Sequence, residues 1–242
     1  MNRFQSTLHR CNHGRPPVWF MRQAGRYHSH YQDLKRRHSF IELCKDPELS
    51  CEVTLGPVQA FGFDAAILFS DLLFPLEVMG QGLQYHPGPE LAWLLRSPRD
   101  LSRLSGGPGL AEGLRFQGRA VQRIRESLPP DKGMIGFVGG PVTLFVYAVE
   151  GSHKGDLSSA IEGFRDGRFE GFCERLIELL AENMADQYRA GADTIAVMDT
   201  CAGDIPLELF ERSGVPSLAR LFEAFHERCP GAPITYYSRH TR

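Results

Sequence analysis

Pro17-Val-Trp-Phe-Met-Arg-Gln-Ala-Gly-Arg-Tyr27 is the stretch that decides the fold. Its first part, Val18–Met21, is an uninterrupted apolar run, which predicts a short strand buried on both faces in a parallel sheet. Arg22 and Arg26 then flank Gln23-Ala24-Gly25, whose small residues let the backbone approach a ligand closely. A guanidinium offers a fixed fork of donors that suits carboxylates, so the stretch predicts a strand that ends at a site for a polyanion. The alternative is that both arginines form structural ion pairs.

Composition sets the broad class. Of its 242 residues, 42% are hydrophobic and 23% are charged. A chain of this length and composition can form one sizeable hydrophobic core. A net charge of −2 with scattered Lys and Arg argues against a nucleic-acid partner. Six cysteines without a C-x-x-C pair, and an N-terminus without the apolar core of a signal peptide, predict reduced thiols in the cytoplasm. No apolar run approaches the roughly 20 residues that span a bilayer, so no membrane partner is expected.

Short apolar runs alternate with longer amphipathic runs along the chain, which is typical of βα units and a parallel sheet. Asp46-Pro47-Glu48 predicts the start of one helix, and Gly62 its end. Gly106–Gly109 is read as a hinge before a helix. The remaining expected elements are strands at 65–70, 134–141, 194–200 and 234–238, an edge strand at 84–86, and helices at 110–128, 168–189, 204–213 and 217–229.

Several residues after the predicted strands are candidates for a functional role. Asp71 comes just after the strand 65–70, on the edge where parallel folds place their ligands, although it would also serve as a helix cap. Tyr147, taken alone, reads as a core aromatic residue. His153 is expected to be a solvated loop residue. Cys201 is not expected to be a nucleophile, because no basic partner lies nearby in the sequence.

Several of these stretches resemble one family. The run Trp19–Tyr27, the run Ile67-Leu-Phe-Ser-Asp-Leu-Leu73 and the run Ile135–Gly151 are similar to three motifs of the uroporphyrinogen decarboxylases of haem biosynthesis. The resemblance implies an α/β fold of the (β/α)₈ TIM-barrel type. It also implies cofactor-independent removal of the four acetate carboxyls of uroporphyrinogen III, giving coproporphyrinogen III. Neither a metal nor another cofactor is then expected.

The resemblance also implies residue roles. Asp71 and Arg22 are the implied catalytic residues, with Asp71 facing the pyrrole nitrogens and Arg22 also a candidate for proton transfer. The implied substrate-binding residues are Arg22, Gln23, Ala24, Gly25, Arg26, Lys35, Asp71, Tyr147 and Thr200. Lys35 stands where the family often has Arg, and Cys201 stands where the family has a bulkier residue.

The resemblance covers nearly the whole chain but only about the first two thirds of the family's length. A (β/α)₈ barrel has eight strands in about 250 residues, whereas about five are expected here. Residues 1–242 are thus expected to form a single domain that lacks the C-terminal part of the barrel, and a homodimer is implied for a full-length relative. Ser238–Arg242 does not resemble the family's C-terminal histidine motif. Two alternatives stay open: an impaired fragment that binds porphyrinogen, and a corrinoid-linked methyltransferase relative, which would need zinc.

Overall fold

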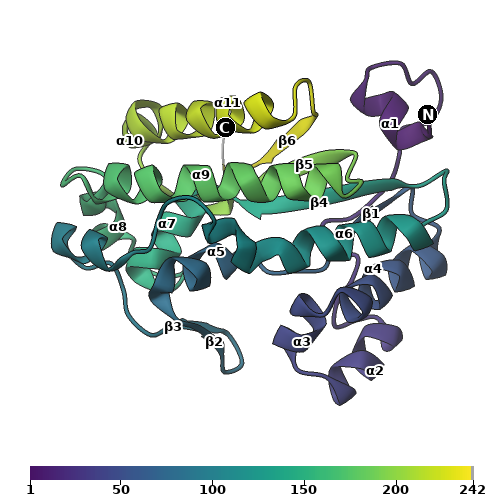
Figure 1. Cartoon of the computed structure of the whole chain (residues 1–242), viewed down its shortest axis with the longest axis horizontal. Coiled ribbons are helices and arrows are strands. Elements are labelled where there is room, and N and C mark those ends of the chain that lie inside the picture. Colours follow the sequence, from purple (N-terminus) through teal and green to yellow (C-terminus); the bar gives the residue numbers. More distant parts are fainter. Residues whose placement is uncertain (241–242) are drawn as a thin grey trace.

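A parallel sheet lies at the centre of the computed structural model, which describes residues 1–240 (Figure 1). Its strand order is β1-β4-β5-β6, and all three neighbouring pairs are parallel. The register pairs Ile67 with Ile135, Gly136 with Ile195, and Val197 with Tyr236. The four strands are β1 (Ala65–Ile67), β4 (Gly133–Gly139), β5 (Thr194–Met198) and β6 (Ile234–Tyr237).

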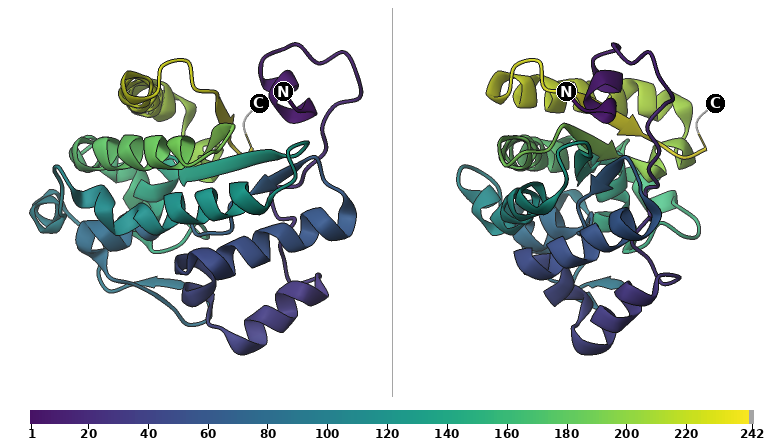
Figure 2. Two further views of the ribbon diagram at one scale, coloured as in Figure 1. Left: turned by 45° about the vertical axis from the view of Figure 1, so that its right-hand side comes forward. Right: turned by 90° about the vertical axis from the view of Figure 1, so that its right-hand side faces the viewer.

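Four long helices cover one face of this sheet, and they lie side by side in the same order as the strands (Figure 2). They are α4 (Pro47–Phe61), α6 (Arg115–Ser127), α9 (Arg168–Arg189) and α11 (Val215–Arg228). Strands that form the inner layer and helices that form the outer layer are the arrangement of a TIM barrel. The predicted α/β fold of this type is therefore confirmed as a partial barrel.

The shorter elements lie at the two ends of the strands. Helix α1 (Arg3–Leu8) is at the amino ends, where the Nδ2 atom of its N-cap residue Asn2 donates to the carbonyl of Lys132 at 2.8 Å. The other helices are α2 (Ser29–Arg37), α3 (Phe40–Lys45), α5 (Phe74–Leu76), α7 (Pro141–Glu150), α8 (Ser158–Gly163) and α10 (Leu207–Leu209). Short helical turns η1 (Glu77–Gln81), η2 (Pro98–Arg103), η3 (Leu110–Leu114), η4 (Thr200–Asp204) and η5 (Phe210–Gly214), and the antiparallel hairpin β2 (Leu83–Tyr85) and β3 (Pro89–Leu91), complete the fold.

Local signals at helix ends act as expected. The Asp46 carboxylate accepts from the N–H groups of Glu48 and Leu49, which begins α4. Gly62, with a left-handed φ of 66°, ends it.

The other helix predictions have mixed outcomes. The predicted helix 168–189 matches α9, but the predicted helix 204–213 is wrong: it is divided among η4, α10 and η5. The polar stretch 31–44 was given no helix, yet it contains most of α2 and all but the last residue of α3.

The strand predicted at Val18–Met21 is not formed. Val18 exchanges only two hydrogen bonds with Asp64, one through its carbonyl at 2.9 Å and one through its N–H to the carboxylate at 2.8 Å. A turn then begins at Phe20, whose carbonyl accepts from Gln23 N–H. No strand of residues 1–240 covers the other side, so Phe20 is 60% exposed rather than buried.

Side chains alternate between the two faces of the sheet. Phe137 of β4 and Met198 of β5 point to the inner face, which is hollowed by a pocket. Gly136 points to the helical layer, where a Cβ atom would come within 2.6 Å of Gln187 Oε1 on α9. None of the helices in residues 1–240 combines the length and the apolar character that crossing a membrane requires. Thr241 and Arg242, at the end of the C-terminal stretch 238–242, lie outside the described residues.

Candidate active site

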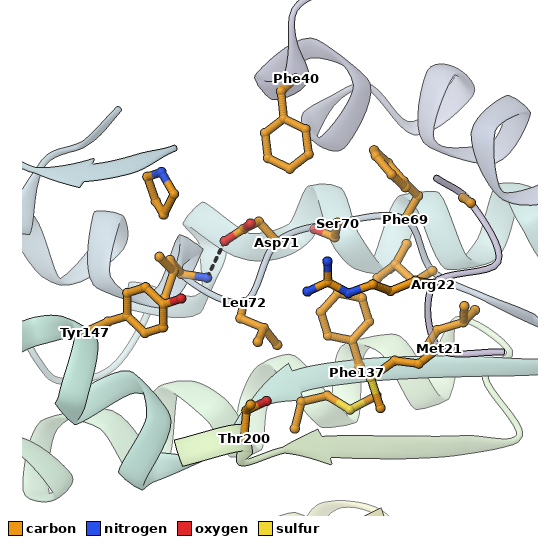
Figure 3. Close-up of a pocket in the computed structure, with 16 residues that line it drawn as sticks. Met21, Arg22, Phe40, Phe69, Ser70, Asp71, Leu72, Phe137, Tyr147 and Thr200 are labelled. Carbon is orange, nitrogen blue, oxygen red and sulfur yellow. Dashed lines mark hydrogen bonds between the residues drawn. The ribbon is translucent and has the colours of Figure 1, made fainter. Parts of the chain in front are cut away.

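A pocket of about 390 Å³ opens on the inner face of the sheet, at the carboxyl ends of β1, β4 and β5 (Figure 3). This is the edge at which barrels of this type place their active sites. Aromatic and aliphatic side chains form most of its wall, and a few polar groups converge within it. The lining residues are Met21, Arg22, Ala24, Phe40, Ile67, Leu68, Phe69, Ser70, Asp71, Leu72, Leu73, Pro89, Phe137, Tyr147, Met198 and Thr200.

Arg22 extends into this pocket from the turn that follows Phe20 (Figure 3). Its side chain makes no ion pair with any carboxylate of residues 1–240. The structural ion pair that was an alternative for Arg22 is thus not made within this part of the chain. An unpaired guanidinium beside an apolar wall is suited to bind a carboxylate of a ligand.

Asp71 lines the same pocket as Arg22 and lies after the end of β1 (Figure 3). Its Oδ1 atom accepts from Leu73 N–H at 2.9 Å, so the capping role that was an alternative is observed. The surrounding protein raises the pKa of Asp71, mainly because it excludes water from the carboxylate. The hydroxyl of Tyr85 lies beside Asp71, buried and without a well-formed hydrogen bond. Asp71 therefore both caps a turn and presents a poorly hydrated carboxylate to the pocket.

A buried amide network holds the corner that contains Asp71. Gln187 on α9 accepts from the Phe137 N–H at 2.9 Å and donates to its carbonyl at 3.0 Å. These backbone groups lack a ladder partner because β1 ends at Ile67. Asn183 donates to Gln117 at 2.7 Å, and Gln117 donates to the hydroxyl of Ser70 at 2.9 Å. The network thus links α9 and α6 to the residue that precedes Asp71.

Tyr147 and Thr200 complete the polar part of the pocket wall. Tyr147 lies on α7, and Thr200 begins η4 just after β5. Burial raises the pKa of Tyr147 to about 12, so its side chain is a neutral phenol at pH 7. Its hydroxyl is 2.5 Å from His153 Nδ1, which corrects the expectation that His153 is a solvated loop residue. The loop after α7 folds back and brings the two rings together.

Asp199 is a buried acid that was given no role from the sequence. Its carboxylate accepts from the N–H of Thr143 at 2.7 Å, and Thr143 Oγ1 accepts from Cys201 N–H at 3.0 Å. Burial raises the pKa of Asp199 to about 6. The contact joins the end of β5 to the first turn of α7, so Asp199 helps to fix both Thr200 and Tyr147. In the sequence, Asp199 directly precedes Thr200.

The other predicted ligand-binding residues lie outside the pocket wall, except Ala24. Gln23 is buried, and its Nε2 atom donates to the Ala65 carbonyl at 3.0 Å, which attaches the arginine turn to β1. A Cβ atom at Gly25 would come within 3.3 Å of the ring of Tyr27. Arg26 and Lys35 have exposed side chains that do not line the pocket.

Cys201 is fully buried, and burial raises the pKa of its thiol to about 11, so it is protonated at neutral pH. Within residues 1–240, no group of three or more His, Cys, Asp or Glu side chains is arranged to hold a metal ion.

Comparison with solved structures shows a likeness of fold. A methyltransferase from Methanosarcina mazei superposes with a TM-score of 0.65 over 80% of this chain and 57% of the other. The two sequences are 20% identical, so the likeness concerns the fold alone.

Sequence comparison identifies closer relatives. The chain is 34% identical to the uroporphyrinogen decarboxylase of Koribacter versatilis, and the match covers 92% of this chain and 64% of the relative. It is 36% identical to the uroporphyrinogen decarboxylase of Rhizorhabdus wittichii, and the match covers 90% of this chain and 64% of that relative. It is 34% identical to the uroporphyrinogen decarboxylase of Roseiflexus sp., and the match covers 98% of this chain and 70% of that relative. The chain therefore spans 64% of the length of the first two relatives.

The sequence model of one family, uroporphyrinogen decarboxylase (URO-D), matches residues 1–242. Because this match covers the whole chain, the protein belongs to the uroporphyrinogen decarboxylase family.

Proposed function

We propose that this chain carries the arginine- and aspartate-lined part of an active site that decarboxylates the four acetate side chains of uroporphyrinogen III. The product is coproporphyrinogen III. One observation supports this most: Arg22, which has no ion pair in residues 1–240, and Asp71, which is poorly hydrated, face one pocket in a member of this family.

The reaction requires a place for electrons when an acetate loses CO₂. Protonation of the adjacent pyrrole carbon creates a cationic ring, and the bonding pair of the departing carboxylate then returns to that ring. A proton then adds to the exocyclic methylene carbon and the proton on the ring carbon is released, which leaves a methyl group on a restored pyrrole. Each acetate thus consumes one proton overall and releases one CO₂. The carboxylate of Asp71 would accept hydrogen bonds from the pyrrole N–H groups and stabilise the cation. No cofactor enters this sequence of steps.

The remaining polar residues would hold the substrate. Arg22 would bind a carboxylate with a bidentate hydrogen bond, and it is also our candidate for proton transfer. The hydroxyls of Tyr147 and Thr200 would contact the substrate from the opposite wall. We assign Gln23, Ala24 and Gly25 to the backbone that the substrate approaches. Outer carboxylates would be bound by exposed Arg26 and Lys35.

A second candidate function is binding without efficient turnover. The described sheet has four strands, whereas a closed (β/α)₈ barrel has eight. The pocket is therefore open on the sides where β1 and β6 have no further partner within residues 1–240.

An assay of two chains distinguishes the candidates. The first is the 242-residue chain, and the second is a chimera in which the remaining C-terminal part of the Koribacter versatilis relative follows residue 242. We expect the chimera to convert uroporphyrinogen III to coproporphyrinogen III and the 242-residue chain to bind but turn over slowly. Failure of both chains to bind the substrate would overturn the proposal.

A further inference from the structure

The hydroxyl of Tyr147 has a partner that the loop after α7 provides. Helix α7 ends at Gly151, whose left-handed φ of 74° reverses the chain. His153 then lies over Tyr147, with its Nδ1 atom 2.5 Å from the hydroxyl and the ring centroids 5.7 Å apart. Both side chains are partly buried, and Tyr147 lines the pocket, so His153 lies directly beside a residue of the pocket wall.

Charged groups surround His153 from several elements. Arg22, Lys154 and Arg239 are the cations near its ring, and Asp204 is the acid, which also pairs with Arg239. Burial of the ring, followed by these cations, lowers the pKa of His153. The free protein therefore holds a neutral imidazole at pH 7, with one acceptor nitrogen and one N–H. His153 Nε2 makes no hydrogen bond to any residue in 1–240.

The short bond restricts how Tyr147 can meet a ligand. A neutral phenol has a single hydrogen, and this hydrogen can point either to Nδ1 of His153 or into the pocket. A carboxylate has no hydrogen to donate, so it requires the hydrogen of Tyr147. When Tyr147 donates to a carboxylate, His153 Nδ1 must carry a proton in order to keep its own bond to the hydroxyl.

We propose that His153 is a positioning residue, which orients the hydroxyl of Tyr147 and, when Nδ1 carries a proton, leaves the hydrogen of this hydroxyl free to donate to a substrate carboxylate. The imidazolium always carries that proton, whereas the neutral ring carries it only as the Nδ1–H tautomer, so a lower pH favours this arrangement, and no covalent bond of the substrate changes. The identity of the ligand as a tetrapyrrole polycarboxylate rests on the proposed function. The pairing of His153 with Tyr147 rests on the geometry alone.

The test is a binding titration of uroporphyrin III, the stable oxidised octacarboxylate, followed by its visible absorbance. The proteins are the wild type, Tyr147→Phe, His153→Ala, His153→Gln, the double variant Tyr147→Phe/His153→Ala, and His13→Ala. His13 is an exposed histidine that does not line the pocket, so its variant is the matched control for loss of an imidazole. Titrations at about pH 8, 7 and 6 follow the titration range of histidine.

Coupled behaviour is the expected result. Tyr147→Phe and His153→Ala each weaken binding about tenfold, as loss of a hydrogen bond to a charged group does. The double variant loses no more affinity for uroporphyrin III than the single variant that binds it more weakly, because the two residues act as one unit. Wild type and His13→Ala bind more tightly as the pH falls, His153→Ala does not share this rise, and His153→Gln recovers part of the affinity.

Two results separate the claims. If wild type binds uroporphyrin but His153→Ala and His153→Gln bind as tightly with the same pH dependence, the inference on His153 is wrong while the proposed function stands. Additive losses in the double variant also overturn it. If wild type does not bind at any pH, the proposed function fails and the inference fails with it. Circular dichroism spectra identify any variant that does not fold.

Discussion

At the residue scale, the carboxylate of Asp71 combines a local and a functional contact. It accepts from Leu73 N–H at 2.9 Å and also lines the pocket. Asn caps a turn about as well as Asp, so Asp71→Asn separates the two contacts.

We expect Asp71→Asn to fold normally and to lose turnover far more than substrate affinity, because the lost charge acts mainly on a cationic intermediate. The chimera described above is the protein to use, with decarboxylation rates measured at saturating and limiting substrate. A loss of at least about a hundredfold in kcat, with KM changed by less than about threefold, is the predicted result. Near-normal kcat in a folded variant would remove Asp71 from the chemistry.

Asp199 leads to a prediction of how the free energy of unfolding changes with pH. Its pKa in the folded chain, about 6, is above the ordinary value of 3.8. A raised carboxyl pKa means that the fold favours the protonated form, so its contribution to stability is largest at low pH and is lost as pH rises through about 6. Between about pH 7.5 and 5, wild type should gain roughly 1 kcal/mol of unfolding free energy relative to Asp199→Asn. Urea titrations of both proteins measure this difference, and a constant or opposite difference contradicts the assignment.

Sequence analysis located some residues of the pocket and missed others, for a physical reason. Asp71 follows the end of β1 and Thr200 follows the end of β5, and the carboxyl ends of parallel strands meet at one edge. Arg22 and Tyr147 line the same pocket from a turn and from α7. Arg26, only four residues after Arg22, leaves the pocket because the chain turns between them. The contacts of His153 and Asp199 depend on a loop reversal and on burial between elements. Neither has a periodic signal in the sequence.

At the scale of elements, helix ends were more predictable than strands. The Asp46 cap and Gly62 act on their own neighbours, so α4 could be inferred from a few residues. Val18–Met21 required a neighbouring strand on each side, but within residues 1–240 its backbone hydrogen-bonds only to Asp64 and to Gln23 of its own turn. An apolar run therefore predicted a buried strand where the structure has an exposed, extended segment.

The link between α9 and β4 gives a prediction at this scale. Gln187→Leu leaves the N–H and the carbonyl of Phe137 without partners in the core. Each buried unsatisfied group costs about 1–3 kcal/mol, so a loss of about 2–4 kcal/mol in unfolding free energy is expected. Gln122→Leu, on the exposed side of α6, is the matched control and should change stability by less than about 0.5 kcal/mol. Equal, small effects in both variants would show that the amide network does not hold the sheet.

At the scale of the whole molecule, the sheet has two open edges in the part of the chain that is described. β1 pairs only with β4, and β6 pairs only with β5. Tyr236 on β6 is 38% exposed, and Val18 beside the start of β1 is 44% exposed. Unpaired strand edges with apolar side chains promote association between chains.

We therefore expect the 242-residue chain to melt broadly and to aggregate as its concentration rises, whereas the chimera melts cooperatively. Calorimetry and light scattering over a concentration series measure both properties. Turnover should be slower in the 242-residue chain than in the chimera, because a pocket that is open on one side neither excludes water nor positions the substrate closely. A soluble 242-residue chain with a sharp transition and the turnover of the chimera would show that the fold closes in another way.

The central claim is that the pocket around Arg22 recognises a polycarboxylate. The most direct measurement compares dissociation constants of uroporphyrin III, with eight carboxylates, and coproporphyrin III, with four, for wild type, Arg22→Ala and Arg99→Ala. Arg99 is exposed and does not line the pocket, so its variant controls for loss of charge. We predict that wild type and Arg99→Ala prefer uroporphyrin, and that Arg22→Ala loses at least about tenfold on uroporphyrin and less on coproporphyrin. Equal binding of both ligands by wild type, or an equal loss on both in Arg22→Ala, would contradict the claim.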